Sequence, residues 1–235
     1  MDKGEVVRIA ATAAVKAILK LFPPHATRLL LRKLEAILED GKWRTKVGVL
    51  DAMKALATSA RDEVADDLGT VLPKVETAMH DTKSEVCRQV PTFPKLTAME
   101  VSSAAIKCAT ALCNTLPNPD LTPHVPALVK CMSEPDAVAA CIKALSSTTF
   151  VAEVTAPALA VLVPLLLRAL NDRSMEVQRR TVVVVDNLVK LVRNPVVAAT
   201  YLSPLVDGVE KVATGASFPE VSKSGTVESH CTNIL

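Results

Sequence analysis

The sequence predicts an all-α fold built from repeated helix pairs, and three observations favour it. Aromatic residues make up only 3% of the chain and glycines number 7 in 235 residues, whereas β-sandwiches and barrels usually use more of both. A proline-centred motif recurs at intervals of roughly 40 residues. Apolar residues recur at steps of three and four, which is the spacing of one face of an α-helix.

The proline-centred motif is hydrophobic-Pro-x-hydrophobic and sets the repeat length. It occurs at Leu72-Pro73-Lys74-Val75, Val125-Pro126-Ala127-Leu128, Val163-Pro164-Leu165-Leu166 and, more loosely, Ser203-Pro204-Leu205-Val206. The prolines are 53, 38 and 40 residues apart, and a period near 40 is typical of HEAT and armadillo arrays. The sequence therefore predicts a HEAT/armadillo-like α-solenoid of about five helix-pair repeats. Because proline inside a helix costs about 3 kcal/mol, each first helix should start or bend at this position.

A polar turn follows each of the first three motifs. The turns are Asp81-Thr82-Lys83-Ser84-Glu85-Val86, Glu134-Pro135-Asp136-Ala137-Val138 and Asn171-Asp172-Arg173-Ser174-Met175-Glu176-Val177. We expect Ser84 and Ser174 to accept hydrogen bonds from the first amides of the helix that follows. Each unit thus consists of a first helix, a short polar turn and a second helix.

Apolar stripes agree with this plan in two units. One unit has Leu159, Leu162, Val163, Leu166 and Leu170 in its first helix and Val177, Val184, Leu188, Leu191 and Val192 in its second. An earlier unit has helices over residues 26–39 and 42–60 and a turn at residues 39–41. Within its second helix we expect Trp43 to be an ordinary packing residue.

The repeat pattern breaks in two places. The first proline spacing is too long because residues 87–101, which contain Pro91 and Pro94, interrupt a second helix. We predict an insertion there, either a genuine loop or translated intervening sequence, and helical character returns near residue 99. The fifth unit has a first helix over about residues 195–213, but residues 222–235 lack an apolar stripe. We therefore predict a solenoid over residues 1–221 with an incomplete last repeat, a disordered tail over 222–235, and a truncated chain.

Several classes of protein are disfavoured. The six cysteines form no C-x-x-C motif and the four histidines no i,i+4 pair, so we predict reduced thiols and no metal or other cofactor. The longest apolar run, residues 156–167, is shorter than the ~20 residues that span a membrane. Ser102, Thr148 and His124 belong to no recognisable nucleophile–base–orienter pattern. The sequence therefore predicts neither an enzyme nor a small-molecule substrate site.

One stretch, Ser146-Ser147-Thr148-Thr149-Phe150-Val151-Ala152-Glu153-Val154-Thr155, resembles the HEAT-repeat N-terminal region of fungal-type translation elongation factor three. The likeness extends to Gly41-Lys42-Trp43, Asp81-Thr82-Lys83-Ser84-Glu85-Val86, Val184-Val185-Asp186-Asn187 and Asn194-Pro195, and covers most of residues 15–221 outside the insertion. Members of this family bind ribosomes through this region and carry two downstream ATP-binding cassettes. No G-x-x-x-x-G-K-[ST] phosphate loop occurs in this chain. The resemblance therefore implies a cytoplasmic, ribosome-binding module without an ATPase of its own.

Three groups of basic residues are the candidate partner-binding residues. They are Lys42, Arg44 and Lys46; Arg168, Arg173, Arg179 and Arg180; and Lys190 and Arg193. Ribosomal RNA would be contacted mainly through phosphates, while ribosomal proteins could use the same surfaces. No matched family motif fixes a contact residue.

Other functions stay open at this stage. HEAT arrays also serve as protein–protein scaffolds in transport receptors and phosphatase subunits, and a giant HEAT-repeat co-activator of the starvation-response kinase has a similar stretch. A truncated and non-functional product is a third alternative, because uncapped apolar repeats tend to aggregate. The net charge of +2 does not decide between them, because any basic surface must be local.

Overall fold

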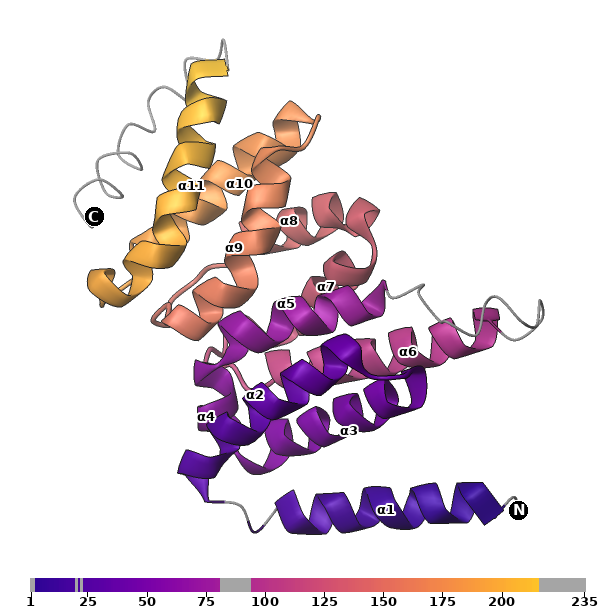
Figure 1. The fold of residues 1–235 in the computed structure, drawn as a ribbon. Coiled ribbons are helices and arrows are strands. Elements are labelled where there is room, and N and C mark those ends of the chain that lie inside the picture. Colours follow the sequence, from indigo (N-terminus) through magenta and orange to yellow (C-terminus); the bar gives the residue numbers. More distant parts are fainter. Residues whose placement is uncertain (1–2, 20, 22, 81–93, 216–235) are drawn as a thin grey trace. The chain divides into compact units, whose positions relative to one another are not determined.

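The computed structural model describes residues 3–19, 21, 23–80 and 94–215, and within these ranges it contains helices and no strand (Figure 1). The helices are α1 (Lys3–Leu19), α2 (Pro24–Asp40), α3 (Trp43–Ser59), α4 (Arg61–Asp66), α5 (Leu68–Met79), α6 (Pro94–Cys113), α7 (Val125–Ser133), α8 (Val138–Ser146), α9 (Ala156–Leu170), α10 (Met175–Val189) and α11 (Pro195–Gly215), with short 3-10 turns at Thr122–His124 and Pro135–Ala137. The all-α prediction is confirmed. The predicted turn at residues 81–86, residues 87–93 of the insertion and the tail lie outside the described residues.

The chain divides into two compact units, Met1–Thr115 and Leu116–Leu235. In the first unit α3 packs against α1, α2 and α6, and α5 packs against α2 and α6. Leu50, Met53 and Leu56 of α3 are fully buried. The helices predicted over residues 26–39 and 42–60 correspond to α2 and α3.

The second unit is built around α9. This helix packs against α7, α8, α10 and α11, and Leu159, Leu162 and Leu166 are almost completely buried in it. The pairs α7/α8 and α9/α10 are the two helix-pair units that the sequence predicted in this region. The predicted first helix of the fifth unit is α11, while its predicted second helix lies outside the described residues.

The repeated prolines occupy two kinds of position. Pro126 lies in the first turn of α7, so its helix starts there as expected. Pro73, Pro164 and Pro204 lie inside α5, α9 and α11, and all three are exposed. Each of these three helices therefore carries its proline on the face that meets solvent.

The turn before α10 differs from the prediction. Ser174 occupies the N-cap position, but its side chain makes no capping hydrogen bond. Asp172 organises the turn instead, because its Oδ1 accepts from the Ser174 N–H at 2.8 Å and its carbonyl accepts from Gln178 Nε2 at 2.7 Å. The expectation that Ser174 caps the helix was wrong, whereas Ser84 lies outside the described residues.

Two helices differ from the sequence interpretation. Helix α6 begins at Pro94 rather than near residue 99, and proline is well suited to a first helical position because its missing N–H has no helical partner there. Part of the predicted insertion is therefore helical. Helix α1 was assigned to no repeat, and its Val6, Val7 and Ile9 are about half-exposed. The extent of the solenoid over residues 1–221 stays a prediction.

The glycines that flank the start of α3 should respond oppositely to alanine. A Cβ at Gly41 would lie 2.5 Å from the Ile37 carbonyl oxygen, whereas a Cβ at Gly48 would meet nothing within 4 Å. We expect Gly41→Ala to lower the free energy of unfolding by about 1 kcal/mol or more. Gly48→Ala should raise it by about 0.5–1 kcal/mol, because alanine favours a helix interior. Urea denaturation of the two variants measures both changes in the free energy of unfolding. If Gly48→Ala lowered the stability, a Cβ at this position would not have the free space that the structure shows.

Candidate partner-binding surface

The first basic group lies at the start of α3. Lys42 is the N-cap residue and is exposed, as is Arg44 in the first turn, while Lys46 is half-buried. The Arg44 guanidinium lies over the Trp43 ring, 5.0 Å from its centroid. Trp43 is half-buried, so it both packs against the protein and supports a charged side chain on its ring.

The second basic group surrounds the turn between α9 and α10. Arg168 donates from Nη1 to the Cys131 carbonyl at 2.8 Å, which ties α9 to α7. Arg180 is paired with Glu176 one turn earlier, with 2.6 Å between Nε and Oε1. Arg173 and Arg179 are exposed. Arg168 and Arg180 thus have structural partners within their own unit.

The third basic group lies at the other end of α10. Lys190 pairs with Asp186 at 2.6 Å, and Arg193 pairs with Glu153 at 3.4 Å. At a rise of ~1.5 Å per residue along α10, Lys190 lies about 15 Å from Arg180, the nearest member of the second group. The structure therefore does not join the two groups into one patch.

In the second unit, hydrogen bonds that the sequence did not predict hold the connection between α8 and α9 in place. Asp120 Oδ2 accepts from the backbone N–H groups of Val151 and Ala152 at 2.7 and 2.8 Å. The buried Asn118 donates from Nδ2 to the Glu153 carbonyl at 3.2 Å. These bonds anchor residues 147–155, most of the segment that carried the family resemblance.

The same segment is anchored at two further points. Thr148 Oγ1 lies 2.9 Å from His124 Nε2, and the Val154 N–H donates to the Leu191 carbonyl at 3.1 Å. Val151 is nevertheless 76% exposed. The only sequence signal for this arrangement was the Asn-Pro-Asp composition of residues 118–120, which is typical of turns.

Asp120 should make this unit less stable as the pH falls into the acidic range. The hydrogen bonds from the Ala152 and Val151 N–H groups hold the pKa of Asp120 below its ordinary value of 3.8. A carboxyl group with a lowered folded-state pKa stabilises the fold above its unfolded pKa, and this stabilisation is lost as the pH falls through the folded pKa. We expect the wild type to lose stability below about pH 4, and part of that loss should be absent in Asp120→Asn.

The measurement is urea denaturation at pH 7 and pH 3. At pH 7 Asp120→Asn should be less stable than the wild type by about 1 kcal/mol, because a carboxylate accepts stronger hydrogen bonds than an amide oxygen. Equal acid-induced losses in the two proteins would show that Asp120 does not contribute to the pH dependence.

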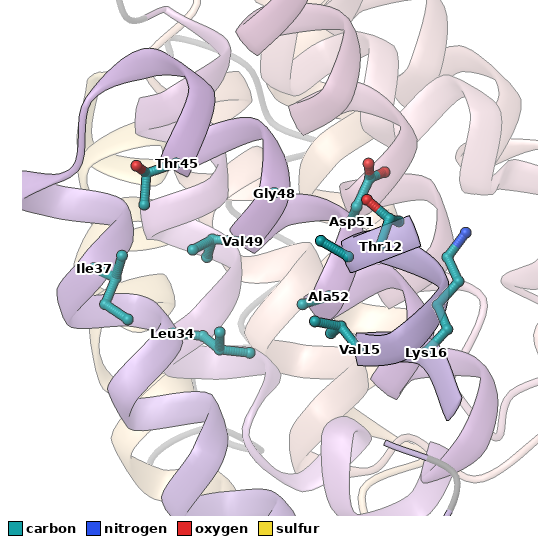
Figure 2. A pocket seen from close by; sticks show the side chains of 11 residues that line it. Thr12, Val15, Lys16, Leu34, Ile37, Thr45, Gly48, Val49, Asp51 and Ala52 are labelled. Carbon is teal, nitrogen blue, oxygen red and sulfur yellow. The ribbon is translucent and has the colours of Figure 1, made fainter. Parts of the chain in front are cut away.

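An open, largely apolar cavity of about 340 Å³ lies between α1, α2 and α3 (Figure 2). Val15, Leu34, Ile37 and Val49 line it, and Thr12, Lys16 and Asp51 stand together at one side. Apart from the Asp51 carboxylate, the Lys16 amine and two threonine hydroxyls, the side chains of the lining are apolar. We assign it no chemical role.

The described cysteines are free thiols in the core. Cys108, Cys113, Cys131 and Cys141 are all buried and unpaired by disulfides. Burial raises the pKa of Cys108 and of Cys113 to about 12, which leaves both protonated and unreactive at neutral pH. Across the described ranges no three His, Cys, Asp or Glu side chains come together in a way that could hold a metal ion. None of the helices described there is long and apolar enough to cross a membrane.

Comparison with known proteins gives two family matches and a consistent set of relatives. Residues 1–90 match the family described as EF3 N-terminal HEAT repeat, and residues 136–230 match Elongation factor 3/GNC1 HEAT repeat. The chain is 44% identical over 223 residues to mRNA export factor elf1 of Schizosaccharomyces pombe. It is 33% identical over 220 residues to elongation factor 3A of Saccharomyces cerevisiae and 34% over 226 residues to elongation factor 3 of Phytophthora infestans.

These alignments cover 93–96% of this chain but only 20% of each of these relatives. The chain therefore spans about one fifth of the length of the curated relatives that it matches. The helices and the family matches together confirm the predicted fold class, an all-α solenoid of HEAT type.

Proposed function

Because this chain belongs to the HEAT-repeat family of elongation factor 3, as its sequence motifs predicted, we propose that it is a ribosome-binding module. It is a HEAT-repeat module of translation elongation factor type. In the proposal it acts in the cytoplasm by associating with ribosomal RNA and proteins, and any ATPase activity belongs to other parts of the factor. The observation that supports the proposal is the family membership, combined with exposed cations on a helical scaffold.

The nine candidate residues differ in how tightly the protein already holds their side chains. Arg168, Arg180 and Lys190 are held by hydrogen bonds or ion pairs at 2.6–2.8 Å, so a partner would have to compete with these contacts. Arg193 has a looser pair at 3.4 Å, and its side chain is 80% exposed. Arg173 is exposed and makes no ion pair with a described residue. Exposed cations without tight partners are best suited to contact phosphates.

Co-sedimentation with ribosomes across a salt series tests the proposal. We expect the chain to pellet with ribosomes at low salt and to be released as salt rises, because phosphate contacts release counterions. The double variant Arg173→Glu/Arg193→Glu should reduce the pelleted fraction at intermediate salt by about tenfold or more. The matched control is Lys33→Glu/Lys143→Glu, which also reverses two exposed cations but outside the three groups.

The contrary outcome is equally clear. If the wild-type chain is folded, as judged by helical circular dichroism, and still does not pellet at low salt, the ribosome proposal fails. A general protein–protein scaffold of HEAT type then becomes the better interpretation, including one that resembles the starvation-kinase co-activator.

A second candidate function is a role in mRNA export. The observation that favours it is the 44% identity to mRNA export factor elf1, against 33% to elongation factor 3A. The two candidates differ in their expected partner. Capture of the tagged chain with polyadenylated RNA after ribosome depletion would favour the export role, whereas loss of all RNA on ribosome depletion would favour the ribosome.

A further inference from the structure

The start of α3 has an unusual distribution of charge. Its first turn contains no acidic residue, and no side chain caps its exposed amides. Lys42 and Arg44 stand at this positive end of the helix dipole, where cations are unfavourable and anions are favoured. Neither of these two side chains makes an ion pair with a described residue. The local charge therefore lowers the stability of the free protein.

Acidic residues close to this turn do not neutralise it. Glu39 is engaged elsewhere, since Lys74 Nζ lies 3.0 Å from Glu39 Oε1 and 3.0 Å from Glu35 Oε2. Asp40 is exposed and makes no ion pair with Lys42 or Arg44. Asp51 lies about two turns further along α3. The excess positive charge at Lys42 and Arg44 is thus available to an external anion.

The stack of Arg44 on Trp43 adds a planar element to this charge. The guanidinium lies 5.0 Å from the ring centroid, which restrains a side chain that would otherwise be mobile. Guanidinium planes and aromatic rings are the surfaces on which unpaired RNA bases stack. Lys42 and Lys46 flank this stack within about 6 Å along the helix axis. A partner with both phosphates and flat bases uses all of these features, whereas an acidic peptide uses only the charge.

We propose that Lys42, Trp43, Arg44 and Lys46, which we name the α3 basic cluster, bind single-stranded RNA. Lys42 and Lys46 contact phosphates, and the Arg44–Trp43 stack supports one base. This assignment deepens the ribosome-binding proposal and rests on it for the biological source of the RNA. The geometry itself requires only an unpaired RNA segment.

Trp43 is the single tryptophan of the chain, so its fluorescence reports this cluster alone. We expect titration of the full chain with a single-stranded RNA oligonucleotide of about 12 nucleotides to change Trp43 emission at low salt. With two phosphate contacts, at Lys42 and Lys46, the logarithm of affinity should fall with the logarithm of salt with a slope of about −1.4. A polyglutamate of equal charge should produce little change.

Variants separate charge from stacking. Lys42→Gln should weaken RNA binding and reduce the magnitude of the salt slope by about 0.7, because one phosphate contact is lost. Arg44→Lys keeps the charge but removes the planar stack, so affinity should fall about tenfold while the slope is retained. Lys54→Gln is the matched control, since Lys54 is an exposed cation of the same helix outside the cluster.

Three results would overturn this inference. They are unchanged Trp43 emission in a folded chain, an equal response to polyglutamate, and equal weakening by Lys54→Gln. If Trp43 does not respond but the chain pellets with ribosomes in a salt-dependent manner, the RNA site fails and the ribosome proposal stands. If Trp43 responds but the chain does not pellet, the RNA site stands and the ribosome proposal fails.

Discussion

Leu162→Ala is expected to lower the free energy of unfolding by about 3 kcal/mol, because it truncates a side chain at the centre of a core. Leu162 is fully buried in α9, the helix that packs against α7, α8, α10 and α11. Truncation removes a methine and two methyl groups from this core and leaves a cavity that four surrounding helices cannot close completely. Urea denaturation followed by circular dichroism measures the loss.

The control for this substitution is Leu29→Ala in α2. Leu29 is 65% exposed, so the same chemical change should alter the free energy of unfolding by no more than about 0.5 kcal/mol. Leucine and alanine both favour helices, so helix propensity should contribute little to either result. Similar losses in the two variants would contradict the central position of α9.

Asn118→Ala is expected to cost about 2–4 kcal/mol, although Asn118 lies in a connection rather than in a helix. Its Oδ1 accepts from the N–H groups of Asp120 and Leu121 at 3.0 and 3.1 Å, and its Nδ2 donates to the Glu153 carbonyl at 3.2 Å. Asn118 is only 2% exposed, so its removal leaves the buried Leu121 N–H without an acceptor. Denaturation measures the stability, and limited proteolysis measures the release of residues 147–155.

Asn118→Asp distinguishes the two roles of this amide. Aspartate keeps an acceptor for Asp120 and Leu121 but cannot donate to Glu153. We therefore expect faster proteolysis of residues 147–155 with a smaller loss of stability than in Asn118→Ala. If both variants behave like the wild type, the bonds of Asn118 contribute nothing measurable to the fold.

The helix pairs could be predicted from the sequence because their signals are local. The proline spacing and the apolar periodicity depend on residues within one or two turns of each other. As a result, the helices predicted over residues 26–39 and 42–60 agree with Pro24–Asp40 and Trp43–Ser59 to within two residues at each end. The sequence interpretation starts α6 too late because it treats Pro94 as a helix breaker, although proline also begins helices.

The details of the candidate surface could not be predicted, because they depend on contacts between distant residues. Arg168 hydrogen-bonds a carbonyl 37 residues away, and Asn118 bonds a carbonyl 35 residues away. Neither side chain has a local pattern that reveals its partner. The Ser174 prediction failed for a different reason, because the bond of this turn joins the Ser174 N–H to the Asp172 carboxylate and does not use the Ser174 hydroxyl. Residue type alone does not reveal which polar side chain organises a turn.

The exposed prolines inside α5, α9 and α11 have a consequence for helix curvature. Proline has no N–H, so the carbonyl four residues before it loses its helical donor and the backbone opens on that side. Helices bend so that their opened, lengthened side faces water. Since Pro73, Pro164 and Pro204 all lie on the solvent side, we expect each helix to arch over the core beneath it. The prolines that reveal the repeat in the sequence are thus expected to determine the curvature of its outer surface, although they are not part of its core.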